Sequence, residues 1–341
     1  MSQQDVYRVH PLAPLHLGER GVGMEETAAT VASDTLFSAL CWAVLELEGP
    51  GWLDEWLGAF ARQPAPFLIT SAFPWAGDIR FYPRPMVPVP VGRATSRSAT
   101  VRKRLKKATY VSEQLFERLA RGQSVEGEME DTNFLPGGIW IAAAERDRLP
   151  PGLARVWAGP DVVPRVALDR LGSAASLYYV GEVRYSEGCG LWFAVRWREA
   201  AWRDVLEKAL SCLGEAGIGG ERSSGRGQFR WERWEEASIP GAPSPDQLGA
   251  TLSLYHPTVE EVRGGALEAG SYRLRTRRGW VGSLPGQGWR GKAVRMLVEG
   301  SVVGAAAVGD LTDVTPDGFA AHRVYRYGLA FNVGVGSGHD G

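Results

Sequence analysis

The sequence lacks any long uncharged apolar run. Hydrophobic residues make up 44% of it, yet none of its apolar stretches approaches the ~20 residues that a membrane-spanning helix needs. The opening residues, MSQQDVYRVH, also lack the basic and apolar regions of a secretory signal peptide. We therefore expect a globular protein in the cytoplasm, with no membrane partner.

Cysteine is scarce, and metal ligands are not grouped. Cys41, Cys189 and Cys212 are odd in number and widely separated, which argues against both a disulfide framework and a zinc site. Neither His-x-Glu pairs nor acidic clusters at metal-ligand spacing occur, so metal-dependent nuclease chemistry has no visible location. The expectation is a protein without a metal or a cofactor.

Acidic residues are absent from two long stretches, 79–112 and 269–298, although the net charge is only −1. Stretches that lack one sign of charge are typical of a polyanion partner, and a solvated basic face is the alternative. The basic residues are Arg80, Arg84, Arg93, Arg97, Arg102, Lys103, Arg104, Lys106 and Lys107 in the first stretch, and Arg273, Arg275, Arg277, Arg278, Arg290, Lys292 and Arg295 in the second.

The segment GIGGERSSGRGQFRW, at 217–231, is rich in glycine but fits no nucleotide-binding motif. The Rossmann pattern requires glycine where Arg222 stands, and the Gly-Lys-Ser/Thr of the Walker loop is absent. A helix is expected before the segment and a strand after it, which is the reverse of both motifs. Glycine amides can converge on an anion, so we predict a phosphate-binding loop. A glycine-rich helix end whose arginines point at water is the alternative.

The hydrophobic patterns predict helices and strands in similar measure. A strand is expected at 6–17 and a β-hairpin at 67–82. The clearest helix covers 33–49, with Ser33 or Asp34 as its N-cap. The chain is therefore expected to have an α+β fold.

A second β-hairpin is expected near the middle of the chain, where alternating stretches at 177–185 and 191–197 flank a turn. Together with the other elements, it gives the order β-α-β-β-α-loop-β, which is the ferredoxin-like or RRM-like order, with large insertions. The composition of 239–247 is that of a linker. We predict an N-terminal domain at 1–238 and a degenerate α+β domain at 239–341.

Several motifs in this order resemble a known family. The glycine-rich loop before the last strand of a ferredoxin-like unit is similar to the signature of the RAMP superfamily of CRISPR RNA-binding proteins. More narrowly, the chain resembles the family of the fourth subunit of the Csm complex, the type III-A effector. The residues that carry this resemblance are PLHLG at 14–18, SDTLFSALC at 33–41, LSLYHP at 252–257, EGS at 299–301 and YRYGLAF at 325–331.

The resemblance implies two RRM-like domains and a structural role without nuclease activity. The subunit would grip the repeat-derived 5′ tag of the crRNA, and it would dock the large polymerase-like subunit and the backbone subunit. A β-hairpin called the thumb would lie between crRNA and target RNA. We place this thumb, or its base, at 165–185, which includes Asp169 and Arg170.

Binding of single-stranded RNA requires groups for phosphates, 2′-hydroxyls and stacked bases. We expect the loop to contribute backbone amides from Gly219, Gly220, Ser223 and Ser224, and a second anion site at the start of the 33–49 helix. A simple N-cap is the alternative there. The candidate RNA-binding residues are Gly217, Gly219, Gly220, Arg222, Ser223, Ser224, Gly225, Arg226, Gly227, His16, Ser33, Thr35, Arg165, Arg170, Arg102 and Lys103.

Two other functions remain open from sequence. In RNA-cleaving members of the superfamily a histidine acts as general acid or base, and His16 is the candidate for a metal-independent endoribonuclease that processes crRNA. PLHLG shows no partner base, which favours a packed or RNA-contacting histidine. The second alternative is a protein scaffold whose basic stretches bind acidic partner surfaces.

Overall fold

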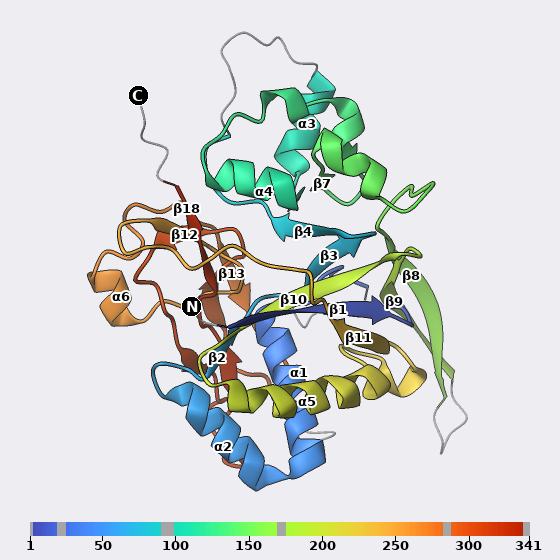
Figure 1. Ribbon diagram of the computed structural model, residues 1–341. Helices are drawn as coiled ribbons and strands as arrows, with labels where there is room; N and C mark the ends of the chain where they lie inside the picture. Colours follow the sequence, from blue (N-terminus) through green and yellow to red (C-terminus); the bar gives the residue numbers. More distant parts are fainter. Residues whose placement is uncertain (1–2, 19–24, 90–98, 169–174, 282–287, 337–341) are drawn as a thin grey trace.

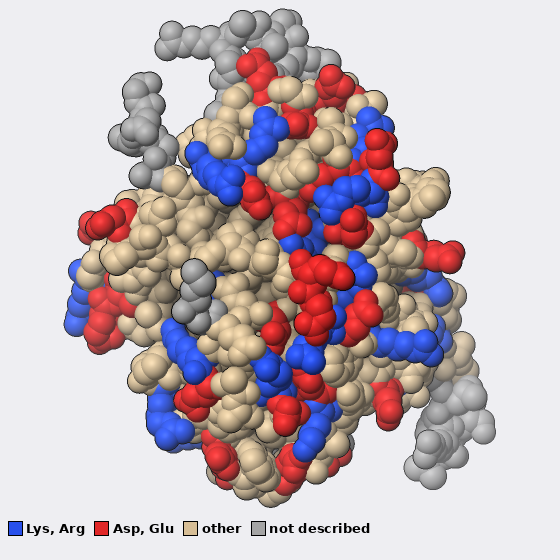
Figure 2. Space-filling view, in the orientation of Figure 1, with Lys and Arg blue, Asp and Glu red and all other residues tan. Residues whose placement is uncertain are grey.

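The computed structural model describes residues 3–18, 25–89, 99–168, 175–281 and 288–336, and it confirms a mixed α+β protein (Figure 1). A large sheet crosses the molecule, helices pack below it in the view, and a smaller set of strands lies beside it. Figure 2 shows basic and acidic side chains intermixed over the face in view. Among the described residues, no helix is both long and apolar enough to span a bilayer.

The large sheet is formed by nine strands of the described part of the chain. They are β1 (Gln4–Pro11), β2 (Phe67–Ile69), β3 (Phe73–Ala76), β4 (Ile79–Pro83), β5 (Tyr110–Ser112), β6 (Phe134–Leu135), β7 (Ile139–Trp140), β10 (Cys189–Trp197) and β11 (Phe229–Arg233). The order is β11-β1-β10-β3-β4-β5-β7-β6, and β2 also pairs with β10. β1 is antiparallel to both β10 and β11. The predicted hairpin at 67–82 is confirmed for β3 and β4, although β2 is a separate strand.

Two helices cover one face of the central strands: α1 (Ser33–Glu48) and α5 (Arg203–Ala216) (Figure 1). They contact each other, and α2 (Pro50–Ala61) packs against α1. Phe37 of α1 lies 4.8 Å from Phe60 of α2 between ring centroids. The predicted helix at 33–49 is thus confirmed, but its N-cap is Ala32, because Ser33 and Asp34 already lie inside the helix.

Residues 99–148 lengthen the sheet beyond β4 and form a helical cap at the top of Figure 1. β5 and β7 pair in parallel, and α4 contacts β4 and β5. The elements of the cap are α3 (Ala99–Lys107), α4 (Glu113–Ala120) and the 3-10 helices η1 (Glu126–Glu128), η2 (Asp131–Asn133) and η3 (Ala143–Arg148).

A long two-stranded hairpin of β8 (Trp157–Leu168) and β9 (Ala175–Tyr185) stands out from the body at the right of Figure 1. The predicted pairing of 177–185 with 191–197 is therefore wrong. β9 pairs with β8, and β10 instead joins β1, β2 and β3 in the large sheet. The alternation of apolar residues predicted both strands but could not identify the partner of each.

The C-terminal part is built from short strands. β12 pairs with β15 and β18, β13 pairs with β14, and β16 pairs with β17. The elements are β12 (Leu248–Thr251), α6 (Val259–Arg263), β13 (Leu274–Arg277), β14 (Val294–Leu297), β15 (Val302–Gly304), β16 (Leu311–Asp313), β17 (Tyr325–Tyr327) and β18 (Asn332–Val335). The predicted linker at 239–247 contains neither helix nor strand.

Candidate nucleic-acid interface

The glycine-rich segment forms a tight loop between α5 and β11, as predicted, with the single 3-10 turn η5 (Arg222–Ser224) inside it. Gly219 has a φ of +96°, a conformation that side-chain-bearing residues rarely adopt. A Cβ at Gly219 would collide with the carbonyl oxygen of His16, and a Cβ at Gly220 would press on the His16 ring. These glycines therefore allow the loop to pack closely against residue 16.

Two of the four amides expected to bind phosphate already have acceptors inside the protein. The Gly220 amide donates to the His16 carbonyl oxygen at 2.9 Å, and the Ser224 amide donates to the Glu221 carbonyl oxygen at 3.0 Å. These two amides therefore donate within the protein in this structure, and the role expected for them toward phosphate stays a prediction. The RNA-binding role of Gly217, Ser223, Gly225 and Gly227 stays a prediction.

Arg226 and Arg165 are both held by Glu182, which lies on β9 at the base of the hairpin. Glu182 is completely buried, and its Oε1 lies 2.7 Å from Nε of Arg226 and 2.9 Å from an amino group of Arg165. Arg184 pairs with the second carboxylate oxygen at 3.1 Å. Burial alone would raise the pKa of Glu182, but hydrogen bonds from Arg226 and Arg165 hold it below its usual value. The two predicted RNA contacts thus connect the glycine loop to the hairpin.

Arg222 is exposed and makes a different contact. Its guanidinium lies 4.3 Å from the ring centroid of Trp42 on α1. A guanidinium stacked on an aromatic ring keeps its charge and its edge donors. Arg222 can therefore still bind a phosphate, whereas the Nε of Arg226 is already taken by Glu182.

His16 is 7% exposed and lies beside the loop, as expected from sequence. Its Nδ1 is 2.8 Å from the carbonyl oxygen of Gly181. Because a carbonyl oxygen can only accept, Nδ1 carries a proton, and in the neutral ring Nε2 is then an acceptor. The contact fixes the orientation of the ring.

The start of α1 is not the anion site expected from sequence. Ser33 is fully buried, and its Oγ accepts from the Leu254 amide at 3.0 Å. Its own amide donates to Oγ of Ser71 at 2.8 Å. Ser33 therefore connects the helix to the neighbouring chain segments, and because it is fully buried, the RNA contact predicted for it is wrong.

Asp34 supplies the negative charge at this helix end. It is fully buried and accepts two hydrogen bonds of 2.9 Å from Arg277 of β13, and it also pairs with Arg326 of β17. Burial opposes ionisation, yet the two guanidinium groups keep the pKa of Asp34 below its usual value. Arg277 further donates to Oγ1 of Thr35 at 3.0 Å. This cluster ties α1 to the C-terminal strands.

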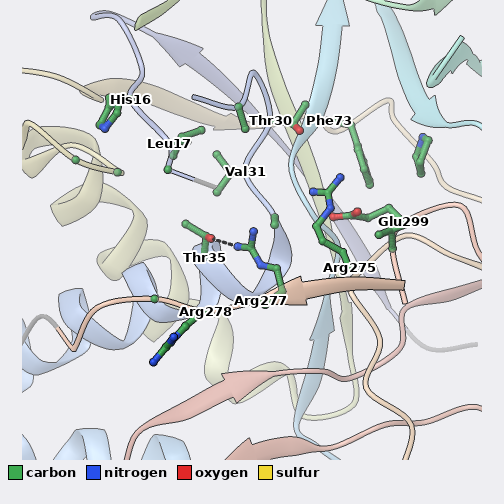
Figure 3. Close-up of a pocket in the computed structure, with 18 of the residues that line it drawn as sticks. His16, Leu17, Thr30, Val31, Thr35, Phe73, Arg275, Arg277, Arg278 and Glu299 are labelled. Carbon is green, nitrogen blue, oxygen red and sulfur yellow. Dashed lines mark hydrogen bonds between the residues drawn. The ribbon is translucent and has the colours of Figure 1, made fainter. Parts of the chain in front are cut away.

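A cleft of about 870 Å³ opens in front of the Asp34 cluster (Figure 3). One wall is formed by His16, Gly219 and Gly220, and the floor includes Thr35 at the start of α1. The opposite wall follows the second acid-free stretch of the sequence. It contributes Arg273, Arg275, Arg277, Arg278 and Arg290, together with Trp280.

The charge of this cleft is strongly one-sided. Glu299 is the only acidic residue among the described residues that line it, and its Oε1 accepts from Oγ of Ser71 at 2.6 Å. Arg273, Arg275 and Arg278 are exposed. The sequence indicated these arginines through the absence of acids around them, but no pattern showed that they would face the glycine loop.

The remaining predicted residues lie elsewhere or outside the described residues. Arg102 and Lys103 are exposed on α3, in the cap, and do not line the cleft. Asp169 and Arg170 belong to 169–174, outside the described residues. Of the predicted residues, the structure thus brings His16, Thr35, Gly219 and Gly220 to one cleft, and it links Arg165 with Arg226 nearby.

Comparison with solved structures finds the same mixed α+β fold in chains of CRISPR effector assemblies. A chain in the crystal structure of the Csm3–Csm4 subcomplex of the type III-A CRISPR-Cas interference complex is similar with a TM-score of 0.63 and 15% identity, over 96% of this chain and 98% of that chain. A chain in the crystal structure of the Csm1–Csm4 cassette with cA4 is similar with a TM-score of 0.56 and 21% identity, over 99% and 100% of the two chains. At these identities the likeness concerns the fold.

Sequence comparison finds Csm4 proteins among those similar to this chain. Residues 244–335 match the family model of the CRISPR Csm4 C-terminal domain. The chain is 29% identical over 316 residues to the CRISPR system Cms protein Csm4 of Thermococcus onnurineus, covering 89% of this chain and 91% of that protein. It is 26% identical over 321 residues to the protein of the same name from Mycobacterium tuberculosis, covering 92% and 91%. The chain is a homologue of the Csm4 proteins, and the resemblance seen in its motifs is confirmed.

Proposed function

We propose that this chain is the subunit of a type III-A Csm complex that holds the 5′ tag of the crRNA, and that the tag lies in the arginine-lined cleft. The observation that carries the proposal is that Arg273, Arg275 and Arg278 line the same cleft as Gly219 and Gly220 of the glycine loop. Guanidinium groups bind phosphate oxygens with paired, charge-assisted hydrogen bonds. Exposed arginines along one wall therefore suit successive phosphates of a single strand.

The strand order supports a ferredoxin-like N-terminal domain at 1–238. In β11-β1-β10-β3, α1 connects β1 toward β3 and α5 connects β10 to β11, which is the β-α-β-β-α-β arrangement. The family match at 244–335 lies within the proposed second domain at 239–341. The projecting hairpin of β8 and β9 is the element that we assign as the thumb.

The proposed partners follow from relatives that crystallised as Csm1–Csm4 and Csm3–Csm4 assemblies. We propose that this chain likewise docks a large polymerase-like subunit and a backbone subunit in the cytoplasm, and that target RNA passes near the hairpin. The Glu182 cluster supports the last point, because it joins the base of the hairpin to the glycine loop that lines the cleft.

We assign no enzymatic role to the chain, and His16 is the residue that tests this. Its place in the cleft favours the alternative of an endoribonuclease, whereas the hydrogen bond to Gly181 is that of a packed histidine. Incubation of the purified protein with repeat RNA in chelator distinguishes the two. We expect intact RNA, and site-specific cleavage that disappears in His16→Ala would contradict the assignment.

The RNA-binding proposal predicts a change in salt dependence. Arg275→Ala with Arg278→Ala should weaken binding of a tag-containing RNA roughly tenfold or more, since each charge-assisted hydrogen bond contributes about 1.5–3 kcal/mol. For single strands the slope of log K against log salt falls by about 0.7 for each phosphate that the protein no longer neutralises. The slope should therefore decrease by about 1.4 in the double variant, if each arginine neutralises one phosphate.

A matched control removes two charges that do not line the cleft. Arg146 and Arg155 are exposed, and Arg146→Ala with Arg155→Ala should leave both affinity and slope unchanged. Equal losses of affinity in the two double variants would mean that RNA binds through general surface charge. An unchanged RNA affinity of Arg275→Ala with Arg278→Ala would contradict the proposal and favour the protein-scaffold alternative.

A further inference from the structure

One large aromatic side chain is exposed within the arginine-lined cleft. Trp280 is 56% exposed and lines the cleft together with Arg278 and Arg290. Scattered exposed apolar residues are normal on protein surfaces. An indole among guanidinium groups is different, because it presents exposed apolar surface directly beside positive charge. The feature calls for a ligand that has both flat apolar surfaces and negative charge.

Trp280 is presented on a ribbon of paired backbone. Trp280 and Arg290 face each other in an isolated β-bridge, flanked by hydrogen bonds from the Val281 amide to the Trp289 carbonyl oxygen at 2.9 Å and from the Gly291 amide to the Gly279 carbonyl oxygen at 3.0 Å. Residues opposite each other in an antiparallel pair lie on the same face. The guanidinium of Arg290 accordingly stacks on the indole, 4.2 Å from its ring centroid.

The ribbon is anchored close to the buried Asp34 cluster. Arg277, whose guanidinium is held by Asp34, precedes Trp280 by three residues. A Cβ at Gly279 would lie 3.1 Å from an amino group of Arg326, the second partner of Asp34. The indole thus projects from a backbone fixed on two sides, which lowers the entropic cost of using it for binding.

We propose that Trp280 and Arg290 form a stacking platform for an unpaired nucleobase of RNA bound in the cleft. Every base has a π-face that can stack on an indole or on a guanidinium plane, whereas in a duplex these faces are covered by neighbouring base pairs. Arg275 and Arg278 lie on the same wall to bind the adjoining phosphates. The platform rests on the proposed function of the cleft and adds selectivity for single strands.

The test compares an RNA that has bases with one that lacks them. Binding of a fluorescein-labelled oligo(A) RNA of about ten nucleotides is measured for the wild-type chain, Trp280→Ala and Trp280→Phe, beside an abasic ribose-phosphate strand of equal length. Trp280→Ala should weaken oligo(A) binding about 5- to 150-fold, the range for removal of one stacked base. Trp280→Phe should retain most of the affinity, and the abasic strand should bind all three proteins alike.

The matched control is Trp52→Ala, because Trp52 is 42% exposed on α2 and does not line the cleft. It should bind oligo(A) like the wild type. An unchanged affinity of Trp280→Ala, or an equal decrease for the abasic strand, would overturn the platform. If Arg275→Ala with Arg278→Ala still weakens RNA binding in that case, the cleft remains the binding site and only the platform fails. Weaker association of Trp280→Ala with another Csm subunit, at unchanged RNA affinity, would instead assign the indole to a protein interface.

Discussion

The two acid-free stretches of this chain look alike in sequence but differ in what their arginines contact. In the first, outside 90–98, Arg80 is 4% exposed and pairs with Glu113, and Arg84 donates to a backbone carbonyl oxygen at 2.7 Å. In the second, Arg277 alone is buried against a carboxylate among the arginines of the cleft wall. The exposed members of that wall are Arg273, Arg275 and Arg278.

This difference shows that an acid-free stretch does not identify a binding surface by itself. Acids distant in sequence can neutralise it, as Glu113 does for Arg80 and Asp34 does for Arg277. In the cleft, the buried carboxylate of Asp34 holds Arg277 at the end of β13, while the arginines near it in sequence, Arg275 and Arg278, are exposed. The position of the partner acids in the fold decides which arginines are buried in ion pairs.

The largest effect is expected from breaking the anchor of the second stretch. Asp34→Asn leaves Arg277 and Arg326 without their shared carboxylate, and removal of one partner of a buried ion pair costs about 3–5 kcal/mol. The free energy of unfolding, measured by urea denaturation, should fall by that amount. The exposed Asp54 on α2 provides the control, since Asp54→Asn should be close to wild type. Equal stabilities of the two variants would contradict the anchoring role.

A smaller decrease in stability is expected at Glu182, where the glycine loop meets the hairpin. Glu182→Gln should lower the free energy of unfolding at pH 7 by about 1–3 kcal/mol, because it removes hydrogen bonds to a charged group. The pKa of Glu182 is lowered in the folded state, so its contribution is present above its unfolded value of about 4.3 and is lost as pH falls through the folded value. The gap between variant and wild type should therefore close on acidification, while the control Glu187→Gln, at an exposed residue, should have nearly wild-type stability at pH 7. A gap that widens in acid would contradict this sign.

Substitution of the two loop arginines should affect the free energy of unfolding and the affinity for RNA to different extents. Arg222→Ala removes a stacked, exposed guanidinium and should change the free energy of unfolding by only about 0.5–1 kcal/mol, yet it should weaken RNA binding. Arg226→Ala should lower stability by more, because it leaves the buried Glu182 with fewer partners. Thermal denaturation and filter binding on the same two proteins check both parts. The reverse order of stabilities would show that Glu182 does not depend on Arg226.

The smallest effect is expected in the first stretch. Arg102→Ala with Lys103→Ala removes two exposed charges of α3 that do not line the cleft. Affinity for tag RNA should change less than about twofold, as expected for charges outside a binding site that act only through screened, long-range attraction. If this variant lost as much affinity for tag RNA as Arg275→Ala with Arg278→Ala, the two acid-free stretches would not differ in RNA binding.

The sequence predicted individual helices and strands better than it predicted which strands pair and which side chains contact one another. The apolar spacing predicted the 33–49 helix and the strand after the glycine loop, because a helical or alternating period depends on local residues. The pairing of β9 with β8 could not be predicted, since both β8 and β10 offer suitable neighbours and the choice depends on the whole sheet. The N-cap assignment of Asp34 failed for a related reason, because a distant arginine pair outweighed the local preference.

The candidate site was also predicted only in part, because local composition is visible in the sequence and contacts between distant segments are not. Glycine and arginine composition pointed to 217–231, and the structure does place Gly219 and Gly220 in the cleft. The opposite wall was visible in sequence only as a charge bias. Trp280 had no signal at all, because one tryptophan in a basic stretch looks the same whether it is buried or exposed.

Photo-crosslinking most directly tests whether the cleft holds RNA. A tag-containing crRNA with 4-thiouridine is bound to the protein, irradiated and digested, and the crosslinked peptides are mapped by mass spectrometry. We predict crosslinks in the peptides that contain 16–18, 219–220 and 273–280. Crosslinks confined to α3, at 99–107, with none in those peptides would contradict the assignment of the cleft.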